Sequence, residues 1–423
     1  MKVLVVGQGG REHALCWALA QSPRVARVYC APGNGGIAEV ATCVPIKETD
    51  LAALAQFARD AGIGLTVVGP EAPLAAGLVD FFRTRGLPIF GPTRAAAQVE
   101  SSKAFAKRIM KASGIPTADY AVFDDLDAAL AYVREKGAPI VVKADGLAAG
   151  KGVTVARTVA EAEAALRRAM QEGAFGTAGS RVVIEECLEG EELSLMAFVD
   201  GETVRPMVPA QDHKPVFDGD RGPNTGGMGA YSPVPQIGPA VIDAAVERIL
   251  KPMAAALVRE GCPFTGVLYA GLMVTADGPK VIEFNARFGD PETQVVLPRL
   301  KTDLLEVLLA VVEGRLAEVE LAWRDEAALC VVLASGGYPH GYETGKAIAG
   351  LDRIDSDVLV FHAGTRRAGE ALVTSGGRVL GVTALGATLA EAQRKAYANV
   401  ARIRFDGMHF RTDIGNRALR AAR

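Results

Sequence analysis

The sequence has few of the features that mark secreted, membrane-spanning or nucleic-acid-binding proteins. No stretch approaches the roughly 18 consecutive apolar residues of a membrane-spanning helix, and the apolar run at 3–6 is too short for a signal-peptide core. The net charge is −3, without a basic block or an acidic tail, which argues against nucleic-acid or membrane partners held by bulk electrostatics. The six cysteines are scattered without a C-x-x-C pair. We therefore expect reduced, buried cysteines in a cytoplasmic protein.

The distribution of apolar residues predicts a multidomain α/β and α+β protein. Over the first hundred residues, strands rich in Val, Leu and Ile alternate with helices, which is typical of a parallel sheet covered on both faces. The predicted strands are 2–6, 27–30, 65–68 and 87–90, and the predicted helices are 12–21, 51–61 and 74–85. We expect an N-terminal parallel α/β domain over 1–101.

Further along the chain, the prediction changes to a two-part central region and a small mixed, β-rich C-terminal domain. A helix over 102–113 leads to strands at 139–143 and 153–156, and a further strand is expected at 181–185. After residue 323 the chain turns to short strands and Gly/Pro turns, ending in a helix at 389–403. We place the central domain at 102–325, with a small lid subdomain at about 120–190, and the C-terminal domain at 326–423.

The first glycine-rich segment, Gly7-Gln8-Gly9-Gly10-Arg11-Glu12, follows a predicted strand and opens a helix. In that position, backbone N–H groups and the helix N-terminus can hold a phosphate. As a dinucleotide fingerprint the segment fails, because Glu12 replaces the last glycine and no carboxylate ends the second strand. A phosphate-bearing small molecule is the preferred interpretation, with simple strand–helix packing as the alternative.

A second glycine-rich segment, 146–152, joins two strands and differs from a Walker A motif in its glycine spacing and in the strand that follows it. Such a hairpin can bring backbone N–H groups to phosphate oxygens, and it carries Lys151 near its tip, with Lys143 on the preceding strand. A third segment, 183–194, runs from a strand through acidic residues and Gly190 into another strand. It could serve a purine and a ribose, or it could be an acidic surface turn.

The segment 281–294 contains the highest density of candidate metal-binding and catalytic side chains. Glu283 and Asn285 are two residues apart, so on a strand both project from the same face. A carboxylate and an amide oxygen suit Mg²⁺ or Mn²⁺, which take further ligands from phosphates and water. Arg287 offers a forked cation, while Asp290 and Glu292 follow in a Gly/Pro turn, where we expect exposed carboxylates able to hold an ammonium group. A structural cluster of ion pairs is the alternative.

The loop at 222–229 is rich in small, turn-forming residues and predicts a mobile lid. His13, His340, His362 and His409 show no metal-ligand spacing, so we expect ordinary surface or core residues. Neither a G-x-S-x-G elbow nor a Cys–His signature for covalent catalysis is present.

Together these segments resemble the ATP-grasp ligases and, within them, the phosphoribosylamine–glycine ligase family. The resemblance covers essentially the whole chain. It is carried by 287–294, by 211–214 with 222–231, by the opening Gly7–Glu12 motif, and by 334–339 and 374–379.

The resemblance implies a role for each group of polar residues. For ATP binding it implies Lys103, Lys143, Gly150, Lys151 and Gly152 near the phosphates, Glu185, Glu186 and Leu188 at the adenine, and Glu192 at the ribose. Glu283 and Asn285 would bind Mg²⁺ or Mn²⁺, and Arg287, Lys214 and Asp290 would serve catalysis, with Asp290 at the glycine ammonium. Phosphoribosylamine and glycine would be held by Gly7, Gly9, Gly10, Arg11, Glu71, Asp212, Asp290, Gly376, Gly377 and Arg378.

The reaction implied is ATP-dependent joining of glycine to 5-phosphoribosylamine through glycyl phosphate, a step of purine synthesis. Such chemistry needs positioning and charge neutralisation more than a protein nucleophile. Rival interpretations are another ATP-grasp ligase or biotin-dependent carboxylase, a non-catalytic nucleotide-binding protein, and an NAD-dependent enzyme. Many ATP-grasp enzymes carry a metal-binding carboxylate on the strand before the metal pair. Here that strand, 269–275, has no acid before Asp277, so the resemblance leaves the number of metals open. Small molecules are the expected partners of a protein expected to be a monomer, although the sequence does not decide the oligomeric state.

Overall fold

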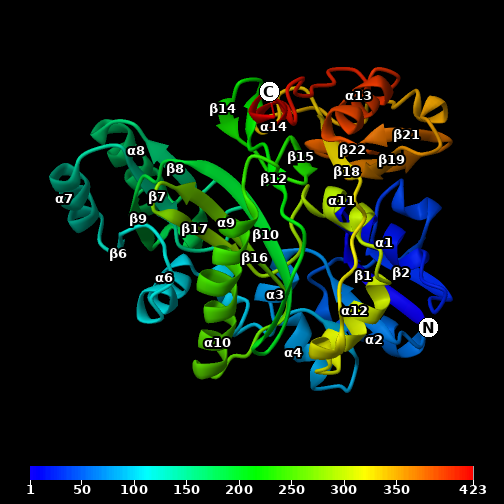
Figure 1. Cartoon of the computed structure of the whole chain (residues 1–423), viewed down its shortest axis with the longest axis horizontal. Coiled ribbons are helices and arrows are strands. Elements are labelled where there is room, and N and C mark those ends of the chain that lie inside the picture. The colour runs from blue at the N-terminus through cyan, green and yellow to red at the C-terminus, as the bar shows by residue number, and fades with distance from the viewer. Residues whose placement is uncertain (423) are drawn as a thin grey trace.

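A computed structural model describes residues 1–422 of the chain. Figure 1 shows the N-terminal sheet and the C-terminal sheet on one side of the molecule and the small sheet subdomain with α7 (Leu126–Lys136) and α8 (Val159–Met170) on the other. Within the described residues, every helix is too short or too polar to cross a membrane. All six cysteines are free; Cys43 and Cys187 are partly exposed and the other four are buried, so the expectation of wholly buried cysteines holds for four of them.

The N-terminal sheet is parallel, as the alternating sequence predicted. Its order is β3-β2-β1-β4-β5, and its strands are β1 (Lys2–Gly7), β2 (Arg27–Pro32), β3 (Thr42–Cys43), β4 (Leu65–Val68) and β5 (Ile89–Phe90). The chain leaves β1 for β2 on one side and leaves β4 for β5 on the other, so β1 and β4 meet at a topological switch point. Ligands of open α/β sheets bind outside the carboxyl ends of strands at such a point.

The helices of this domain are α1 (Gly10–Ala20), α2 (Leu51–Asp60), α3 (Glu71–Ala75) and α4 (Leu78–Arg83). The prediction of one helix over 74–85 was wrong. Gly77 separates α3 from α4 because it has φ +88°, a left-handed conformation that glycine adopts easily and that ends the first helix. Starting at Glu71, α3 directly follows β4, which places the Glu71 side chain at the switch point.

The lid subdomain is a four-stranded antiparallel sheet of order β6-β9-β7-β8, backed by α7 and α8. Its strands are β6 (Tyr120–Phe123), β7 (Ile140–Ala144), β8 (Val153–Ala156) and β9 (Val182–Glu186). The helices α5 (Gln98–Ser101) and α6 (Lys103–Ala112) lead into it, and Ser102 caps α6 by accepting a hydrogen bond from the N–H of Phe105. The glycine-rich segment after Ala144 is the β7–β8 hairpin, as predicted.

A second antiparallel sheet has the order β11-β10-β16-β17. Its strands are β10 (Glu191–Asp200), β11 (Thr203–Pro206), β16 (Thr265–Thr275) and β17 (Gly278–Asn285). The segment before β16 forms α9 (Pro239–Ala245), a π-helical turn (Val246–Leu250) and α10 (Lys251–Arg259). Short helices α11 (Thr293–Val296) and α12 (Leu304–Val312) follow β17.

A third antiparallel sheet crosses the domain boundary predicted at 325/326. Its order is β12-β15-β18-β22-β19, and β12 (Gln211–Asp212) and β15 (Gly229–Ser232) come from the central region, while β18 (Ala327–Ala334), β19 (Leu359–His362) and β22 (Arg378–Gly386) come from the C-terminal segment. Two hairpins flank it, β13 (Pro215–Phe217) with β14 (Arg221–Asn224) and β20 (Thr365–Ala368) with β21 (Ala371–Thr374). The remaining helices are α13 (Leu389–Val400) and α14 (Asn416–Ala421).

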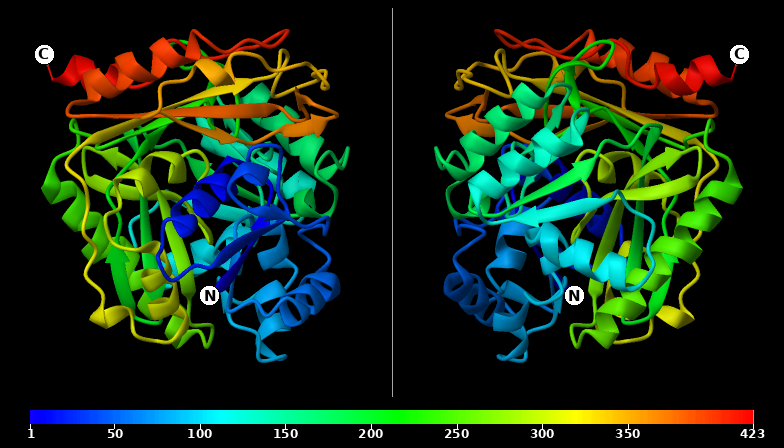
Figure 2. Two further views of the ribbon diagram at one scale, coloured as in Figure 1. Left: turned by 90° about the vertical axis from the view of Figure 1, so that its right-hand side faces the viewer. Right: turned by 90° about the vertical axis from the view of Figure 1, so that its left-hand side faces the viewer.

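The N-terminal and C-terminal parts of the chain are in direct contact. The backbone N–H of His362 in β19 donates to Nδ1 of His13 in α1 over 2.7 Å, and Figure 2 shows the C-terminal strands running across the N-terminal helix. His13 and His362 are therefore core residues and His340 is exposed. The contact brings the start of β22, at Arg378, close to the carboxyl end of β1.

Candidate active site

Glu283 and Asn285 lie at the end of β17, which is an edge strand of the β11-β10-β16-β17 sheet. They pair with Gly271 and Tyr269 of β16 in unbroken register, so their side chains share a face, as the spacing predicted. The Glu283 carboxylate makes no hydrogen bond or ion pair with any residue from 1 to 422, and Asn285 Oδ1 accepts only from Arg287 Nη2, at 3.3 Å. These oxygens suit a hard divalent cation.

Within the described part of the chain, no three His, Cys, Asp or Glu side chains form a ready metal cage. A cation held by Glu283 and Asn285 would take its remaining ligands from phosphate and water oxygens, as Mg²⁺ commonly does. Gly271, opposite Glu283, leaves the approach to that carboxylate free of a side chain.

Just beyond β17, Arg287 bridges three parts of the chain. Its Nη2 is 2.8 Å from Oε1 of Glu100, and its Nε is 3.3 Å from Oε2 of Glu71. Burial acts to lower the pKa of Arg287, but the Glu100 and Glu71 carboxylates outweigh it and raise that pKa. Glu100 was not singled out from the sequence; it also accepts from the N–H of Ala286 over 2.8 Å and so fixes the turn after β17.

The expectation that Asp290 and Glu292 are exposed was wrong. Glu292 is 3% exposed and accepts a hydrogen bond from the hydroxyl of Tyr269 over 2.8 Å. Asp290 Oδ1 accepts from Nε2 of Gln294 over 2.8 Å and lies 3.5 Å from Nη1 of Arg378. Burial acts to raise the pKa of Asp290, but Arg378 and Arg11 outweigh it and lower that pKa.

The Gly7–Gly10 loop faces Asp290 from the N-terminal sheet. The backbone N–H of Arg11 points to Oδ2 of Asp290 at 3.4 Å. Glu12, whose only sequence signal was its failure to match a dinucleotide fingerprint, is buried beneath the loop. It accepts from the N–H of Gly9 and from Nε of Arg11, each over 2.7 Å, and so anchors the loop from below.

The lid subdomain contributes a buried cluster of opposite charges. Lys143 of β7 lies 3.1 Å from Glu185 of β9, and Lys103 donates from Nζ to the carbonyl of Gly146 over 3.2 Å, which joins α6 to the β7–β8 hairpin. Gly150 at the turn has φ +75° and Lys151 is exposed. Gly152 is packed so closely that an added Cβ would lie 2.8 Å from Cβ of Ala148.

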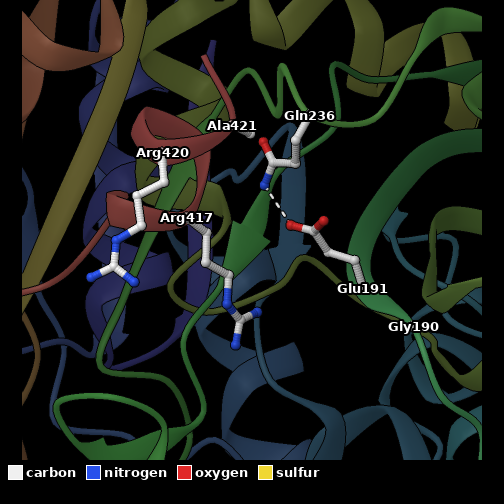
Figure 3. Close-up of a pocket in the computed structure, with 6 residues that line it drawn as sticks. All are labelled: Gly190, Glu191, Gln236, Arg417, Arg420 and Ala421. Carbon is white, nitrogen blue, oxygen red and sulfur yellow. Dashed lines mark hydrogen bonds between the residues drawn. The ribbon is translucent and has the colours of Figure 1, made fainter. Parts of the chain in front are cut away.

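Lys214, between β12 and β13, lies between two carboxylates. Its Nζ is 2.7 Å from Oε2 of Glu192 at the start of β10 and 3.6 Å from Oδ1 of Asp212. Burial raises the pKa of Asp212 to about 7, against the opposing effect of Lys214. Beside Glu192, a pocket of about 390 Å³ opens between β10 and α14. In Figure 3, Gln236 points toward Glu191, and its Nε2 donates to Oε1 of Glu191 over 2.6 Å. Glu191 and Glu192 are consecutive residues of β10, so their side chains point to opposite faces of the strand.

The backbone at 186–188 joins the end of β9 to the turn before β10. The Glu186 carboxylate accepts from the N–H of Asp119 over 3.2 Å and is otherwise exposed, while Leu188 is half-buried. Neither side chain reaches the Lys143 cluster by a hydrogen bond, so any role of these residues in ligand binding would fall to their backbone groups.

The loop at 222–229 is hydrogen-bonded to the C-terminal segment, and its mobility as a lid stays a prediction. Arg378 Nη1 donates to the carbonyl of Gly226 over 2.8 Å and to that of Asp290 over 3.0 Å, and the N–H of Gly226 donates to the Tyr338 hydroxyl over 3.0 Å. Gly376 and Gly377 accept hydrogen bonds from Ser335 and form the turn that presents Arg378. The guanidinium therefore joins the loop, Asp290 and β22.

This arrangement of four sheets, with a glycine-rich hairpin on one and an acid–amide pair on another, is that of a ligase of the ATP-grasp type. Family models for the N domain, the ATP-grasp (A) domain and the C domain of phosphoribosylglycinamide synthetase match residues 1–100, 101–293 and 328–417. The chain belongs to the phosphoribosylglycinamide synthetase family, whose curated members are named phosphoribosylamine–glycine ligase.

Several relatives are similar over almost the full length. The phosphoribosylamine–glycine ligase of Halalkalibacterium halodurans is 60% identical, covering 99% of this chain and 97% of that protein, and that of Allochromatium vinosum is 57% identical, covering 99% of both. The crystal structure of the Thermotoga maritima ligase matches with a TM-score of 0.86 at 34% identity, over 98% of this chain and all of that one. A Campylobacter jejuni biotin carboxylase matches with a TM-score of 0.74 at 14% identity, over 97% of this chain and 92% of that one, and shows the shared fold alone.

Proposed function

We propose that the chain joins glycine to 5-phosphoribosylamine, using ATP and Mg²⁺ or Mn²⁺, with glycyl phosphate as the intermediate. The observation that carries the proposal is the position of Asp290. This carboxylate lies between the Arg11 backbone of the N-terminal loop and the Arg378 guanidinium of the C-terminal segment, seven residues beyond Glu283. The names of the relatives support the choice of substrates.

In the proposed complex, the ATP phosphates lie between the β7–β8 hairpin and β17. Lys103, Lys143 and the backbone of Gly150, Lys151 and Gly152 approach the phosphates. Glu283 and Asn285 would hold the metal, which would supply charge neutralisation for phosphoryl transfer when bound. Glu185 and the backbone of Glu186 and Leu188 contact the adenine.

Glu192 takes the ribose in this proposal, and Lys214 serves the reaction centre. The ion pairs of Lys214 support the role of the lysine. Because Lys214 contacts both Glu192 and Asp212, it lies between the strand that would hold ATP and, on its other side, the residues that would hold the substrate. Asp212 contributes to substrate binding from that side.

The proposed substrate side uses the switch point of the N-terminal sheet. In this proposal, the phosphate of phosphoribosylamine lies at Gly7, Gly9, Gly10 and the Arg11 backbone. The N–H groups of Gly9 and Arg11 are bonded to Glu12 and Asp290, so the support for this placement is the positive end of the α1 dipole at this loop. Glu71, Gly376, Gly377 and Arg378 complete that side, and Asp290 holds the glycine ammonium. Glu71 and Glu100 keep Arg287 oriented at the end of β17, from where its charge can stabilise the developing acyl phosphate.

Neither of the two chemical steps requires a nucleophile from the protein. A glycine carboxylate oxygen attacks the γ-phosphorus of ATP, and ADP leaves. The amine of phosphoribosylamine then attacks the carbonyl carbon of glycyl phosphate, phosphate leaves with the former glycine oxygen, and the amine loses a proton as the amide forms.

An isotope experiment tests this sequence. Glycine labelled with ¹⁸O in its carboxylate is incubated with ATP, Mg²⁺ and freshly made phosphoribosylamine, and the phosphate released is analysed by mass. We expect one ¹⁸O atom in the phosphate and the amide product in equal amount. Unlabelled phosphate would exclude glycyl phosphate, and absence of glycine-dependent ADP would exclude the ligase assignment. The monomeric, cytoplasmic state expected from composition stays a prediction.

A further inference from the structure

Lys107, on α6 one turn beyond Lys103, is buried at the centre of the charge cluster in the lid. Its Nζ is 3.2 Å from Oε2 of Glu185, while Nζ of Lys143 is 3.1 Å from Oε1 of the same carboxylate. All three side chains are only 3–4% exposed. Because buried charges are costly unless they are paired, the three groups form one unit in which a single carboxylate is shared by two cations.

Both lysines are fixed to β17, the strand that carries Glu283 and Asn285. Lys143 donates from Nζ to the carbonyl of Ile282 over 2.9 Å. Lys107 donates from Nζ to Oγ1 of Thr117 over 2.7 Å, and that hydroxyl donates to the carbonyl of Val281 over 2.7 Å. The cluster therefore links the lid sheet to the strand beside the metal pair.

One oxygen of this cluster lacks a hydrogen-bond donor. Glu185 Oε1 is buried and accepts no hydrogen bond from any residue between 1 and 422, although the Lys143 ammonium lies 3.1 Å from it. The Lys143 ammonium offsets the charge of this oxygen, but the oxygen still has an unused acceptor position for a hydrogen-bond donor. A nucleobase amino group is such a donor, whereas a base with a carbonyl at that position would present an acceptor to an acceptor.

We propose that Lys107 is a positioning residue for the nucleotide. By holding Oε2, it keeps Oε1 of Glu185 directed at the amino group of the base, and it prevents Lys143 from being drawn onto both oxygens of the carboxylate. Lys143 then remains available to phosphate. This inference rests on the proposed function, because it assumes that ATP lies between β9 and β17.

The test compares Lys107→Met with Lys107→Arg, and uses Lys111→Met as the matched control. Lys111 is on the same helix and is exposed. For Lys107→Met we expect KM for ATP to rise about 10-fold, the scale of one lost hydrogen bond to a charged group, while KM for glycine changes little. We also expect the preference for ATP over inosine triphosphate, which has a carbonyl in place of the amino group, to fall by a similar factor. Lys111→Met should leave both quantities unchanged.

Lys107→Arg keeps the charge, so it should retain most of the preference for ATP. The proposal is overturned if folded Lys107→Met keeps the ATP preference, or if its KM values for ATP and glycine rise by the same factor. If Lys107→Met does not fold, the double variant Lys107→Met/Glu185→Gln, which removes both charges, takes its place. It should fold and still lose the preference, and retention of the preference would overturn the proposal.

Failure of the proposed function gives a different result from failure of this inference. Binding of ATP and of inosine triphosphate is measured by calorimetry without glycine, so the comparison stands whether or not the wild-type protein forms the amide. Equal binding of the two nucleotides by the wild-type protein would overturn the role of Lys107 alone.

Discussion

The Arg378 guanidinium lies 3.5 Å from the Asp290 carboxylate, so a residue of the C-terminal segment neutralises an acid that follows β17. The same guanidinium nitrogen donates to the carbonyls of Asp290 and Gly226. Three segments that are far apart in the sequence therefore meet at one side chain. Asp290 also faces the Arg11 backbone. A substitution at Arg378 should therefore change the position and the pKa of the Asp290 carboxylate on the proposed substrate side.

Replacing Arg378 by Met should weaken the proposed handling of glycine and phosphoribosylamine. Burial raises the pKa of Asp290, and Arg378 is the largest of the effects that lower it. Loss of the cation should therefore move the acid limb of the pH–rate profile to higher pH, because Asp290 becomes protonated earlier. We expect kcat/KM for phosphoribosylamine at neutral pH to fall about 10-fold, with KM for ATP unchanged.

Arg366→Met is the matched control for this change, because Arg366 is an exposed arginine of β20 in the same C-terminal segment. We expect Arg366→Met to leave the acid limb of the pH–rate profile at the wild-type pH. An acid limb that does not move in Arg378→Met would show that Asp290 does not control activity through its charge.

Replacing Glu283 by Gln should weaken the use of the metal. Gln keeps the shape and one oxygen but removes the anionic charge, and Glu283 has no partner among residues 1–422 that would be orphaned by the change. We expect the Mg²⁺ concentration for half-maximal rate to rise at least about 10-fold, the scale seen when support for a bound metal is lost. Titration of glycine-dependent ADP formation with Mg²⁺ measures it.

The matched control for Glu283→Gln is Asp277→Asn, in the exposed turn before the same strand. This variant should titrate like the wild-type protein. Equal shifts in the two variants would place the metal elsewhere.

The sequence predicted features that depend on local spacing. The strand–turn–helix at Gly7, the β7–β8 hairpin and the shared face of Glu283 and Asn285 all follow from residues close together in the chain, and the structure bears them out. The split between α3 and α4 was missed because an isolated glycine in a helical pattern does not reveal whether it has positive φ.

Features that depend on distant partners could not be predicted. The Gly/Pro turn around Asp290 suggested exposure, but Arg378 and the loop at 226–227 cover it. Glu100 contacts a residue 186 positions away, and Lys107 contacts Glu185 across two elements. Their local sequence is that of ordinary helix residues, so only the tertiary fold identifies them as part of the site.

Replacing Gly10 by Ala should disturb the substrate side without touching the nucleotide side. An added Cβ would lie 2.6 Å from Nε2 of Gln294, the atom that donates to Asp290. The displaced amide should release Asp290, and we expect KM for phosphoribosylamine to rise by about 10-fold or more, since small displacements of positioning groups have effects of this size. Steady-state rates at saturating ATP measure it.

Gly341→Ala provides the comparison for Gly10→Ala, because nothing lies within 4 Å of the added Cβ there. We expect Gly341→Ala to keep the wild-type KM for phosphoribosylamine. Unchanged kinetics in Gly10→Ala would mean that Gln294 does not position Asp290.

Acid should destabilise the junction between α1 and β19. Burial lowers the pKa of His13 to about 3 and that of His362 to about 4, from an ordinary 6.5, and Nδ1 of His13 must be unprotonated to accept from the N–H of His362. Between pH 6.5 and 4 the unfolded chain binds protons that the folded chain does not. Stability is therefore unaffected by these groups above pH 6.5 and is lost as the pH falls, by about 1.4 kcal/mol per pH unit for each histidine.

The variant His13→Gln tests this origin of acid sensitivity, because a Gln carbonyl can still accept from His362 but does not titrate. We expect the slope of the unfolding free energy against pH, measured by urea denaturation from pH 6.5 to 4, to decrease by about 1.4 kcal/mol per pH unit. His340→Gln, at an exposed position, should keep the wild-type slope. If His13→Gln keeps it as well, protonation of His13 does not limit stability in acid, and the carboxylates of the site become the groups to test next.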